Sequence, residues 1–128
     1  MNTFIRFATI LLRVCGILAV ILGLLFWTGN ALSLIGVHML LGMLVVLLLW
    51  IVGVGQAFSK GGSWMLALGA LALGALVIAL GLRQTTLLVG PYHWVIQVFH
   101  LLLGGLAVGV GQISAARYRK APTAELVS

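Results

Sequence analysis

The chain has 128 residues, of which 63% are hydrophobic and 6% are charged, and its formal net charge is +6. A soluble domain carries about a quarter of its residues as charged side chains, so this composition excludes a water-soluble globule. The single cysteine excludes an internal disulfide, and a single acidic side chain, Glu125, excludes paired-acid catalysis and carboxylate metal sites. The sequence also lacks the phosphate-binding, zinc-protease and serine-hydrolase motifs.

Four apolar stretches follow one another along the chain and predict four membrane-spanning helices. They cover about residues 5–27, 32–58, 64–82 and 91–116. A helix needs about 20 apolar residues to cross a bilayer, and the continuous apolar runs exclude the alternating strands of a membrane β-barrel. We therefore expect residues 1–116 to form an all-α, four-helix transmembrane up-down bundle. Residues 117–128 are expected to form a basic and then flexible tail.

Small residues gather on one face of the first and third stretches. These residues are Gly16, Ala19 and Gly23 in the first stretch, and Ala67, Ala70, Gly74 and Gly81 in the third. Small residues let membrane helices approach closely, so both helices are predicted to be packing elements, and the same faces allow a homo-oligomer. The first stretch also resembles a signal peptide, but its apolar run is long for one, and we expect it to remain as a span.

The basic residues predict the orientation of the bundle. Of the seven Lys and Arg residues, all except Arg83 fall on one side of the predicted membrane. The positive-inside rule then places both termini in the cytoplasm of a bacterial-type inner membrane. These charges lie at helix ends rather than in a stripe, which favours lipid contacts over nucleic-acid binding. Arg13, inside the first span, is expected to reach the head groups or to pair with Gln56 or Gln112.

A partial internal repeat relates the second and fourth stretches and suggests a duplicated helical hairpin. Residues 38–46 and 100–108 are identical at six of nine positions, and each stretch later contains Gly-Val-Gly-Gln. The spacing from histidine to glutamine differs, at 18 and 12 residues. At 100° per residue, Gln56 falls on the face of His38, whereas Gln112 falls about 120° from His100.

Histidines provide the candidate site. The second and fourth spans run in the same direction, so they are expected to lie diagonally in the bundle, with His38 and His100 at similar depth in its outer half. A b-type haem requires two imidazoles on opposite sides of its iron, presented by rigid helices. A glycine one turn away, Gly42 or Gly104, leaves room for the porphyrin. We therefore expect His38 and His100 to be the axial ligands of one haem b iron.

Three further residues are expected near this cofactor. Gln97 lies one turn from His100 and is a candidate to support a ligand, or to bond a neighbouring helix. His93 lies seven residues before His100 on nearly the same face, and Arg83 precedes the loop between the third and fourth spans. Arg83 and His93, with Tyr92, are expected at the outer surface, where the haem propionates would point.

With its four spans and two His-x-x-x-Gly segments, the chain resembles small four-helix membrane cytochromes b, of the cytochrome b561-like kind. The resemblance implies haem held between facing helices and electron exchange with a quinone or a partner protein. Larger members often hold two haems, whereas three histidines allow one bis-histidine haem here. Alternatives are another tetrapyrrole in the same site, a non-catalytic accessory or assembly subunit, and a small channel or transporter with the histidines as a polar path.

Overall fold

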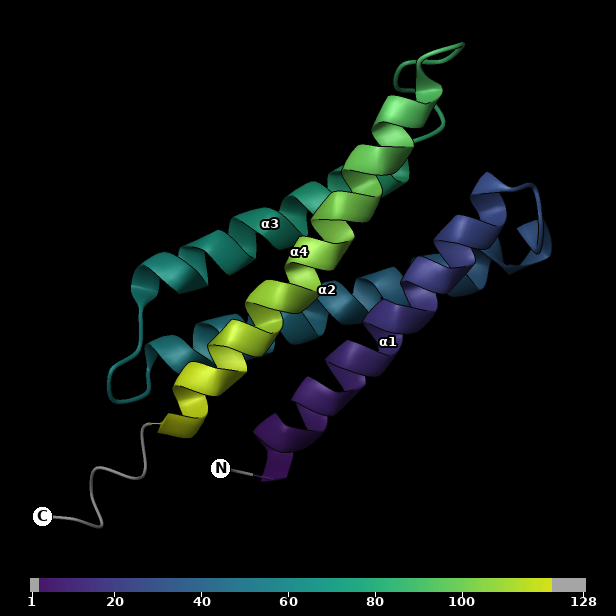
Figure 1. Cartoon of the computed structure of the whole chain (residues 1–128). Helices are drawn as coiled ribbons and strands as arrows, with labels where there is room; N and C mark the ends of the chain where they lie inside the picture. The colour runs from purple at the N-terminus through teal and green to yellow at the C-terminus, as the bar shows by residue number, and fades with distance from the viewer. Residues whose placement is uncertain (1–2, 121–128) are drawn as a thin grey trace, which may run out of the picture.

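Four long α-helices make up most of the computed structural model, which describes residues 3–120. They are α1 (Thr3–Trp27), α2 (Ile35–Ala57), α3 (Trp64–Arg83) and α4 (His93–Lys120), and a short 3-10 helix, Leu32–Leu34, leads into α2. No strand occurs within the described residues. The expected all-α four-helix bundle is confirmed (Figure 1). Each helix is long and apolar enough to cross a membrane, as the sequence predicted.

The fourth helix differs most from its expected bounds. It begins at His93, after a turn in which the His93 backbone N–H donates to the Gly90 carbonyl oxygen (3.1 Å), so Pro91 precedes the helix. It then continues to Lys120 instead of ending near residue 116. Its last turn contains three cations, which interact favourably with the negative end of the helix dipole. The predicted tail therefore starts within a helix, and residues 121–128 lie outside the described residues.

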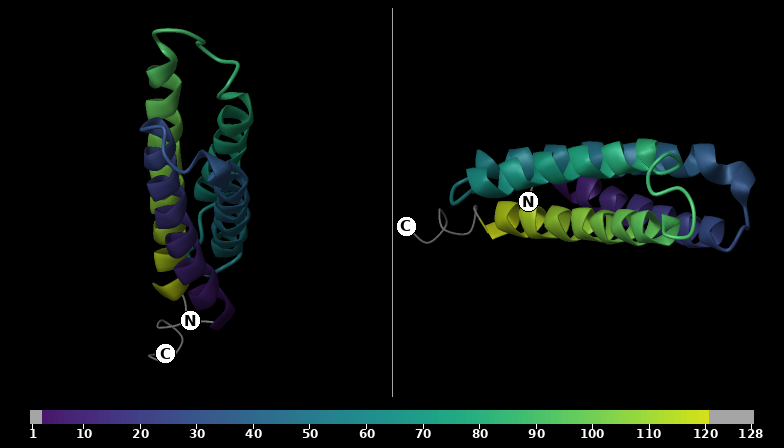
Figure 2. Two further views of the ribbon diagram at one scale, coloured as in Figure 1. Left: turned by 90° about the vertical axis from the view of Figure 1, so that its right-hand side faces the viewer. Right: turned by 90° about the horizontal axis from the view of Figure 1, so that it is seen from above.

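Successive helices run in opposite directions, and both ends of the described chain lie at one end of the bundle (Figure 1). We call this the basic end, and we call the other, with the connections at residues 28–34 and 84–92, the loop end. Figure 2 shows α1 beside α4 in one layer and α2 beside α3 in the other. Helices α2 and α4 also contact each other across the diagonal, whereas α1 and α3 do not. The predicted diagonal pairing of the second and fourth spans is confirmed.

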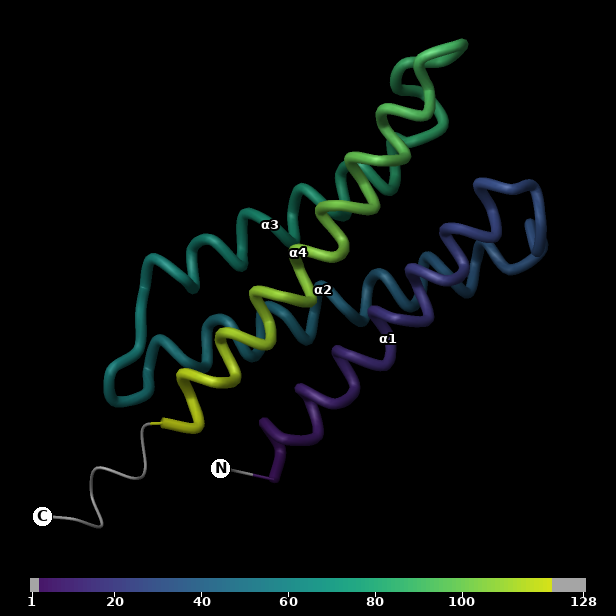
Figure 3. The backbone as a smooth tube through the Cα atoms, in the orientation of Figure 1, coloured from purple at the N-terminus to yellow at the C-terminus, as the bar shows by residue number. Residues whose placement is uncertain are grey.

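The buried core fills only the half of the bundle near the basic end. Leu12, Leu49 and Val52 are among its fully covered side chains. No residue from 17 to 44 or from 78 to 106 is buried. These two segments are the loop-end parts of the α1–α2 and α3–α4 hairpins, which separate toward the loop end (Figure 3). The two hairpins are thus held together mainly through one half of their length.

Glycines allow close helix contacts within this core. A Cβ atom added to Gly53 of α2 would lie 2.6 Å from the Ala70 Cβ of α3. On the other side of the bundle, Gly111 of α4 packs against Leu12 of α1. The predicted small-residue faces therefore serve contacts between helices, and glycines of α2 and α4 contribute as well.

Gln56 fastens the turn between α2 and α3. Its side chain is fully buried; its Nε2 donates to the carbonyl oxygens of Ser63 (2.7 Å) and Gly53 (3.0 Å), and its Oε1 accepts from the Ser63 N–H (3.0 Å). The Ser63 hydroxyl in turn accepts from the Leu66 N–H at the start of α3 (3.2 Å). The sequence suggested Gln56 and Gln112 as partners of Arg13. Gln56 therefore does not pair with Arg13.

Replacing Gln56 by leucine is expected to lower the free energy of unfolding by about 3 kcal/mol, because the half-buried Ser63 N–H loses its acceptor and the Ser63 and Gly53 carbonyl oxygens each lose one donor. The measurement is denaturant unfolding in detergent followed by circular dichroism. Ser59→Ala is the control, since the Ser59 hydroxyl donates one hydrogen bond in the same turn, to the Gln56 carbonyl oxygen (2.7 Å). It is expected to cost about 1 kcal/mol or less. Equal losses would contradict this role of Gln56.

Candidate functional site

His38 and His100 face each other across the bundle. The first belongs to α2 and the second to α4, the two helices on the contacting diagonal. The centres of the two imidazole rings are 6.3 Å apart, and the ring planes meet at 61°. Both histidines are half-buried and lie in the part of the bundle near the loop end, where no residue is fully buried. The structure thus brings together the two residues that the sequence predicted as a ligand pair.

The separation of the rings matches two imidazoles that share one metal. An imidazole nitrogen lies about 2 Å from a bound metal and about 1 Å from its own ring centre, so rings on opposite sides of one ion are centred about 6 Å apart. Each ring can also rotate about its own nitrogen–metal axis, so an angle of 61° between the planes is compatible with shared ligation. The pair therefore fits a single metal centre.

The Nδ1 atoms of both histidines are buried and have no hydrogen-bond partner among the described residues. Buried polar groups in proteins are nearly always hydrogen-bonded, so two unpaired ring nitrogens at one place call for an explanation. Phe26 packs edge-on against His38, with ring centres 5.3 Å apart. The backbone of Ala19 also lies beside the His38 ring, without a hydrogen bond of good geometry to Nδ1. Phe26 and the Ala19 backbone thus border the His38 ring, whereas Nδ1 of His100 has no polar partner among the described residues.

Each histidine packs against a glycine of the other helix in its own hairpin. A Cβ added to Gly23 of α1 would lie 3.5 Å from Cε1 of His38, and one added to Gly81 of α3 would lie 3.1 Å from Cε1 of His100. The sequence placed both glycines on packing faces but did not connect them to the histidines. Their position near the loop ends of α1 and α3, at the same depth as the rings, could have indicated these contacts.

Gly42 and Gly104 lie one turn from His38 and His100, on the same helix faces. A Cβ added to either glycine would meet no atom within 4 Å. The space beside each histidine is therefore bordered by bare backbone, on α2 and on α4 alike. The predicted contact of these glycines with a porphyrin remains a prediction.

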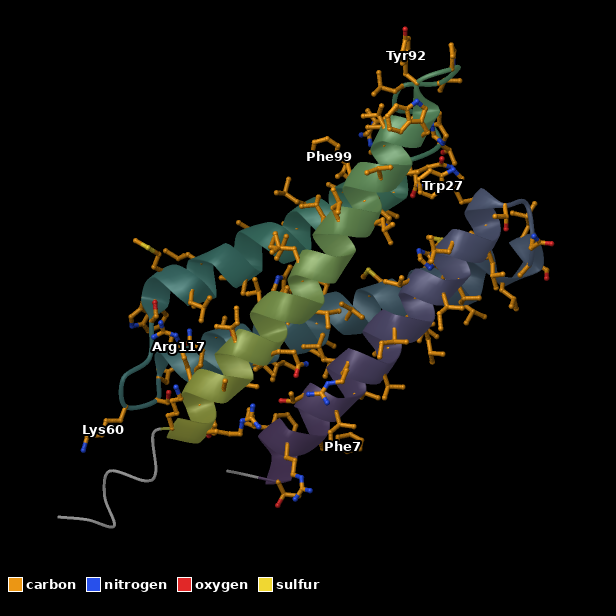
Figure 4. The ribbon with its side chains drawn as sticks, viewed as in Figure 1. Phe7, Trp27, Lys60, Tyr92, Phe99 and Arg117 are labelled. Atoms are coloured by element: carbon orange, nitrogen blue, oxygen red, sulfur yellow. The ribbon has the colours of Figure 1, made fainter. Side chains whose placement is uncertain are left out.

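The other predicted site residues lie near the loop end and make no hydrogen bond to the histidine pair within residues 3–120. His93 donates through Nδ1 to the Leu87 carbonyl oxygen (3.2 Å) and so joins the start of α4 to the preceding loop. Arg83 is exposed at the end of α3, and Gln97 is half-buried on α4. No hydrogen bond within residues 3–120 joins any of the three to His38 or His100. Tyr92 projects from the tip of the same end (Figure 4).

Arg13 lies in the other half of the bundle and pairs with Gln112. Its Nη2 donates to the Gln112 Oε1 (2.7 Å), which links α1 to α4. One of the two glutamines expected from the sequence is therefore the partner of Arg13. The repeated segment Gly-Val-Gly-Gln has different roles in the two hairpins. Gln56 hydrogen-bonds the α2–α3 turn, whereas Gln112 accepts a hydrogen bond from Arg13.

The donor set restricts what kind of metal this site could hold. Within the described part of the chain, no group of three or more His, Cys, Asp or Glu residues is placed to bind an ion. Protein zinc sites use three or four such ligands, whereas a haem supplies four equatorial nitrogens and needs only axial ligands from the protein. Two facing imidazoles beside bare backbone therefore fit haem better than a bare ion. Comparisons with protein-family models, curated proteins and solved structures found no match.

Proposed function

We propose that this chain is a membrane-embedded b-type cytochrome that binds one haem b through His38 and His100. The observation that carries the proposal is the pair of imidazoles, 6.3 Å apart, in the half of the bundle that has no buried side chain. When bound, a haem supplies a one-electron couple between two oxidation states of its iron. The function is then electron transfer, with a quinone or a partner protein as the other party.

The chain contributes ligation, positioning and burial. Each imidazole comes from a different helix, so the separation of α2 and α4 controls the distance between the two ligands. Gly23 and Gly81 allow the flanking helices to approach the rings closely. At the loop end, Arg83 offers donors for the carboxylates of a haem, His93 joins the start of α4 to the loop beside it, and Gln97 offers an amide on the α4 face of His100.

Two observations favour this proposal over the alternatives. An accessory subunit whose histidines bond neighbouring helices would have a partner for each ring, yet only the His38 ring lies beside a backbone hydrogen-bonding group, that of Ala19, and neither Nδ1 is paired among the described residues. A polar path through the bundle would need polar groups linked from the histidines to the basic end, yet no hydrogen bond within residues 3–120 joins His38 or His100 to Gln56 or to the Arg13–Gln112 pair, and Leu49 and Val52 lie between them on α2. A tetrapyrrole held near the loop end is consistent with both observations.

The proposed setting is a bacterial-type inner membrane, with the basic end in the cytoplasm. The support is the uneven distribution of Lys and Arg, since Arg83 is the one such residue near the loop end. The proposed haem then lies in the outer half of the bilayer. A reporter fused to the C-terminus is expected to be active in the cytoplasm, and a periplasmic reporter would contradict this orientation.

The experiment that tests the function is a visible spectrum of the full chain, purified in mild detergent from haem-replete cells. We expect a sharp α-band in the reduced-minus-oxidised spectrum. Alkaline pyridine treatment should identify haem b, at one per chain. A colourless preparation would overturn the proposal and favour the accessory subunit or the transporter. A pigment with a chlorophyll-like spectrum would keep the histidine pair but replace the cofactor.

Gly81→Ala is expected to disturb the site, whereas Gly23→Ala serves as its matched control. The new Cβ would lie 3.1 Å from the His100 ring in the first case and 3.5 Å from the His38 ring, an ordinary contact, in the second. We expect crowding of about 1–2 kcal/mol at Gly81, which corresponds to about tenfold faster haem loss. Transfer of haem to apomyoglobin measures this rate. Equal rates in the two variants would contradict the positioning role of Gly81.

A further inference from the structure

Three residues of α1 lie around the His38 ring. Phe26 packs edge-on against it, with ring centres 5.3 Å apart and ring planes at 78°. A Cβ atom added to Gly23 would lie 3.5 Å from Cε1 of the ring, and the backbone of Ala19 lies beside it. Residues 19, 23 and 26 are spaced by four and three positions, so they share one face of the helix. Helix α1 therefore supplies one wall of the site, in addition to the packing role expected from the sequence.

The turn that follows α1 holds Phe26 in place. The Gly29 N–H donates to the Phe26 carbonyl oxygen (2.9 Å), and the Asn30 N–H donates to the Leu25 carbonyl oxygen (2.8 Å). These two bonds form a Schellman motif, in which the residue after the helix adopts a left-handed conformation. Gly29 adopts it, with a φ of 79°. The last turn of α1 is thereby closed, and the backbone that carries Phe26 is fixed.

The plane of a histidine ring depends on its neighbours. The torsion between Cβ and the ring has broad preferences, so the residue alone does not select one orientation. Within residues 3–120, the His100 ring makes one aromatic contact, with His38. The His38 ring makes a second one, with Phe26. An edge-to-face arrangement is favoured for aromatic pairs, so rotation of the His38 ring away from its observed plane would lose this contact.

We propose that Phe26 is a positioning residue that fixes the plane of the His38 ring. The proposal rests on the proposed function, in which His38 is one of two ligands of a haem iron. The π orbitals of an imidazole are perpendicular to its plane, so its bonding to iron depends on the direction of that plane. The angle between the two rings, 61° here, therefore influences the g values of ferric iron. Phe26 acts through His38 and not on the iron itself.

The test is electron paramagnetic resonance of the ferric protein, with the full chain purified in mild detergent. Phe26→Leu keeps an apolar side chain but removes the ring, and we expect the largest g value to shift. Phe26→Tyr retains the ring and is expected to keep the wild-type g values. A Phe26→Leu protein that contains haem and has wild-type g values would overturn the positioning role. A colourless wild-type protein would instead overturn the proposed function.

Phe99→Leu is the matched control. Phe99 directly precedes His100 on α4, and its side chain is 57% exposed. Figure 4 shows this side chain on the side of α4 that faces away from α1. The substitution removes the same ring type beside the other ligand, and we expect it to leave the g values unchanged. A shift as large as that of Phe26→Leu would overturn the assignment to Phe26.

A second measurement needs no haem. The chain contains three histidines, so the nuclear magnetic resonance signals of labelled imidazoles can be assigned by single substitutions in the ligand-free protein. The ring current of Phe26 is expected to displace the His38 signals. Phe26→Leu should remove this displacement and change the His100 signals less. Unchanged His38 signals in Phe26→Leu would overturn the contact, and with it the proposal.

Discussion

Replacing either His38 or His100 by alanine is expected to reduce the haem content of the purified protein at least tenfold. Each ring supplies one of the two proposed ligands. The ring centres are 6.3 Å apart, so either substitution leaves a single ligand. His93 is not expected to substitute for His100, because it lies seven residues earlier on α4, about 10 Å along the helix axis. The measurement is the reduced-minus-oxidised spectrum at equal protein concentration.

His93→Ala is the matched control for this experiment, since it removes the same residue type from the same helix as His100. It is expected to retain the spectrum. A second readout is rescue: His38→Gly and His100→Gly proteins should regain part of the α-band when imidazole is added, because the free base can occupy the space of the lost side chain. If His93→Ala lost as much haem as His100→Ala, the assignment of the pair would be wrong.

Gly74→Leu is expected to be the most damaging apolar substitution in α3. A Cβ at Gly74 would press against Nε1 of Trp50 and lie 2.8 Å from Cγ1 of Val46. A rigid indole and a β-branched side chain cannot move aside easily, so the larger leucine must push α2 and α3 apart. We expect a loss of about 3 kcal/mol or more in the free energy of unfolding in detergent. Tryptophan fluorescence during unfolding in sodium dodecyl sulfate measures it.

Gly69→Leu tests the same change in the same helix without the clash. A Cβ at Gly69 would meet no atom within 4 Å, and the residue borders a shallow hollow of about 420 Å³ between α3 and α4. Leucine is also a better helix former than glycine by about 1 kcal/mol. We therefore expect unchanged or higher stability. A destabilisation as large as that of Gly74→Leu would mean that packing around Trp50 is not the cause.

The four spans could be predicted closely because their signal is the length of continuous apolar sequence, which depends on the bilayer more than on packing. The end of α4 could not. Arg117, Arg119 and Lys120 look like the start of a solvated tail, yet cations also stabilise the last turn of a helix. Composition alone does not decide between these two roles.

The facing of His38 and His100 could be predicted because parallel spans in an up-down bundle lie on a diagonal. Their contacts with Gly23 and Gly81 could not, since these depend on how each helix is rotated about its own axis. The glutamines show the same limit. Matching Gly-Val-Gly-Gln segments suggest equal roles, but the shift in spacing places Gln56 at a turn and Gln112 against Arg13.

Because the core is one-sided, the interface between the two hairpins resists separation more strongly at the basic end than at the loop end. Near the basic end, separation exposes buried apolar side chains, whereas near the loop end it exposes none that are buried. Local opening therefore costs least around the two imidazoles, and amide hydrogens there are expected to exchange fastest in the ligand-free chain. A ligand that binds both rings bridges the hairpins and adds its own binding free energy to closure.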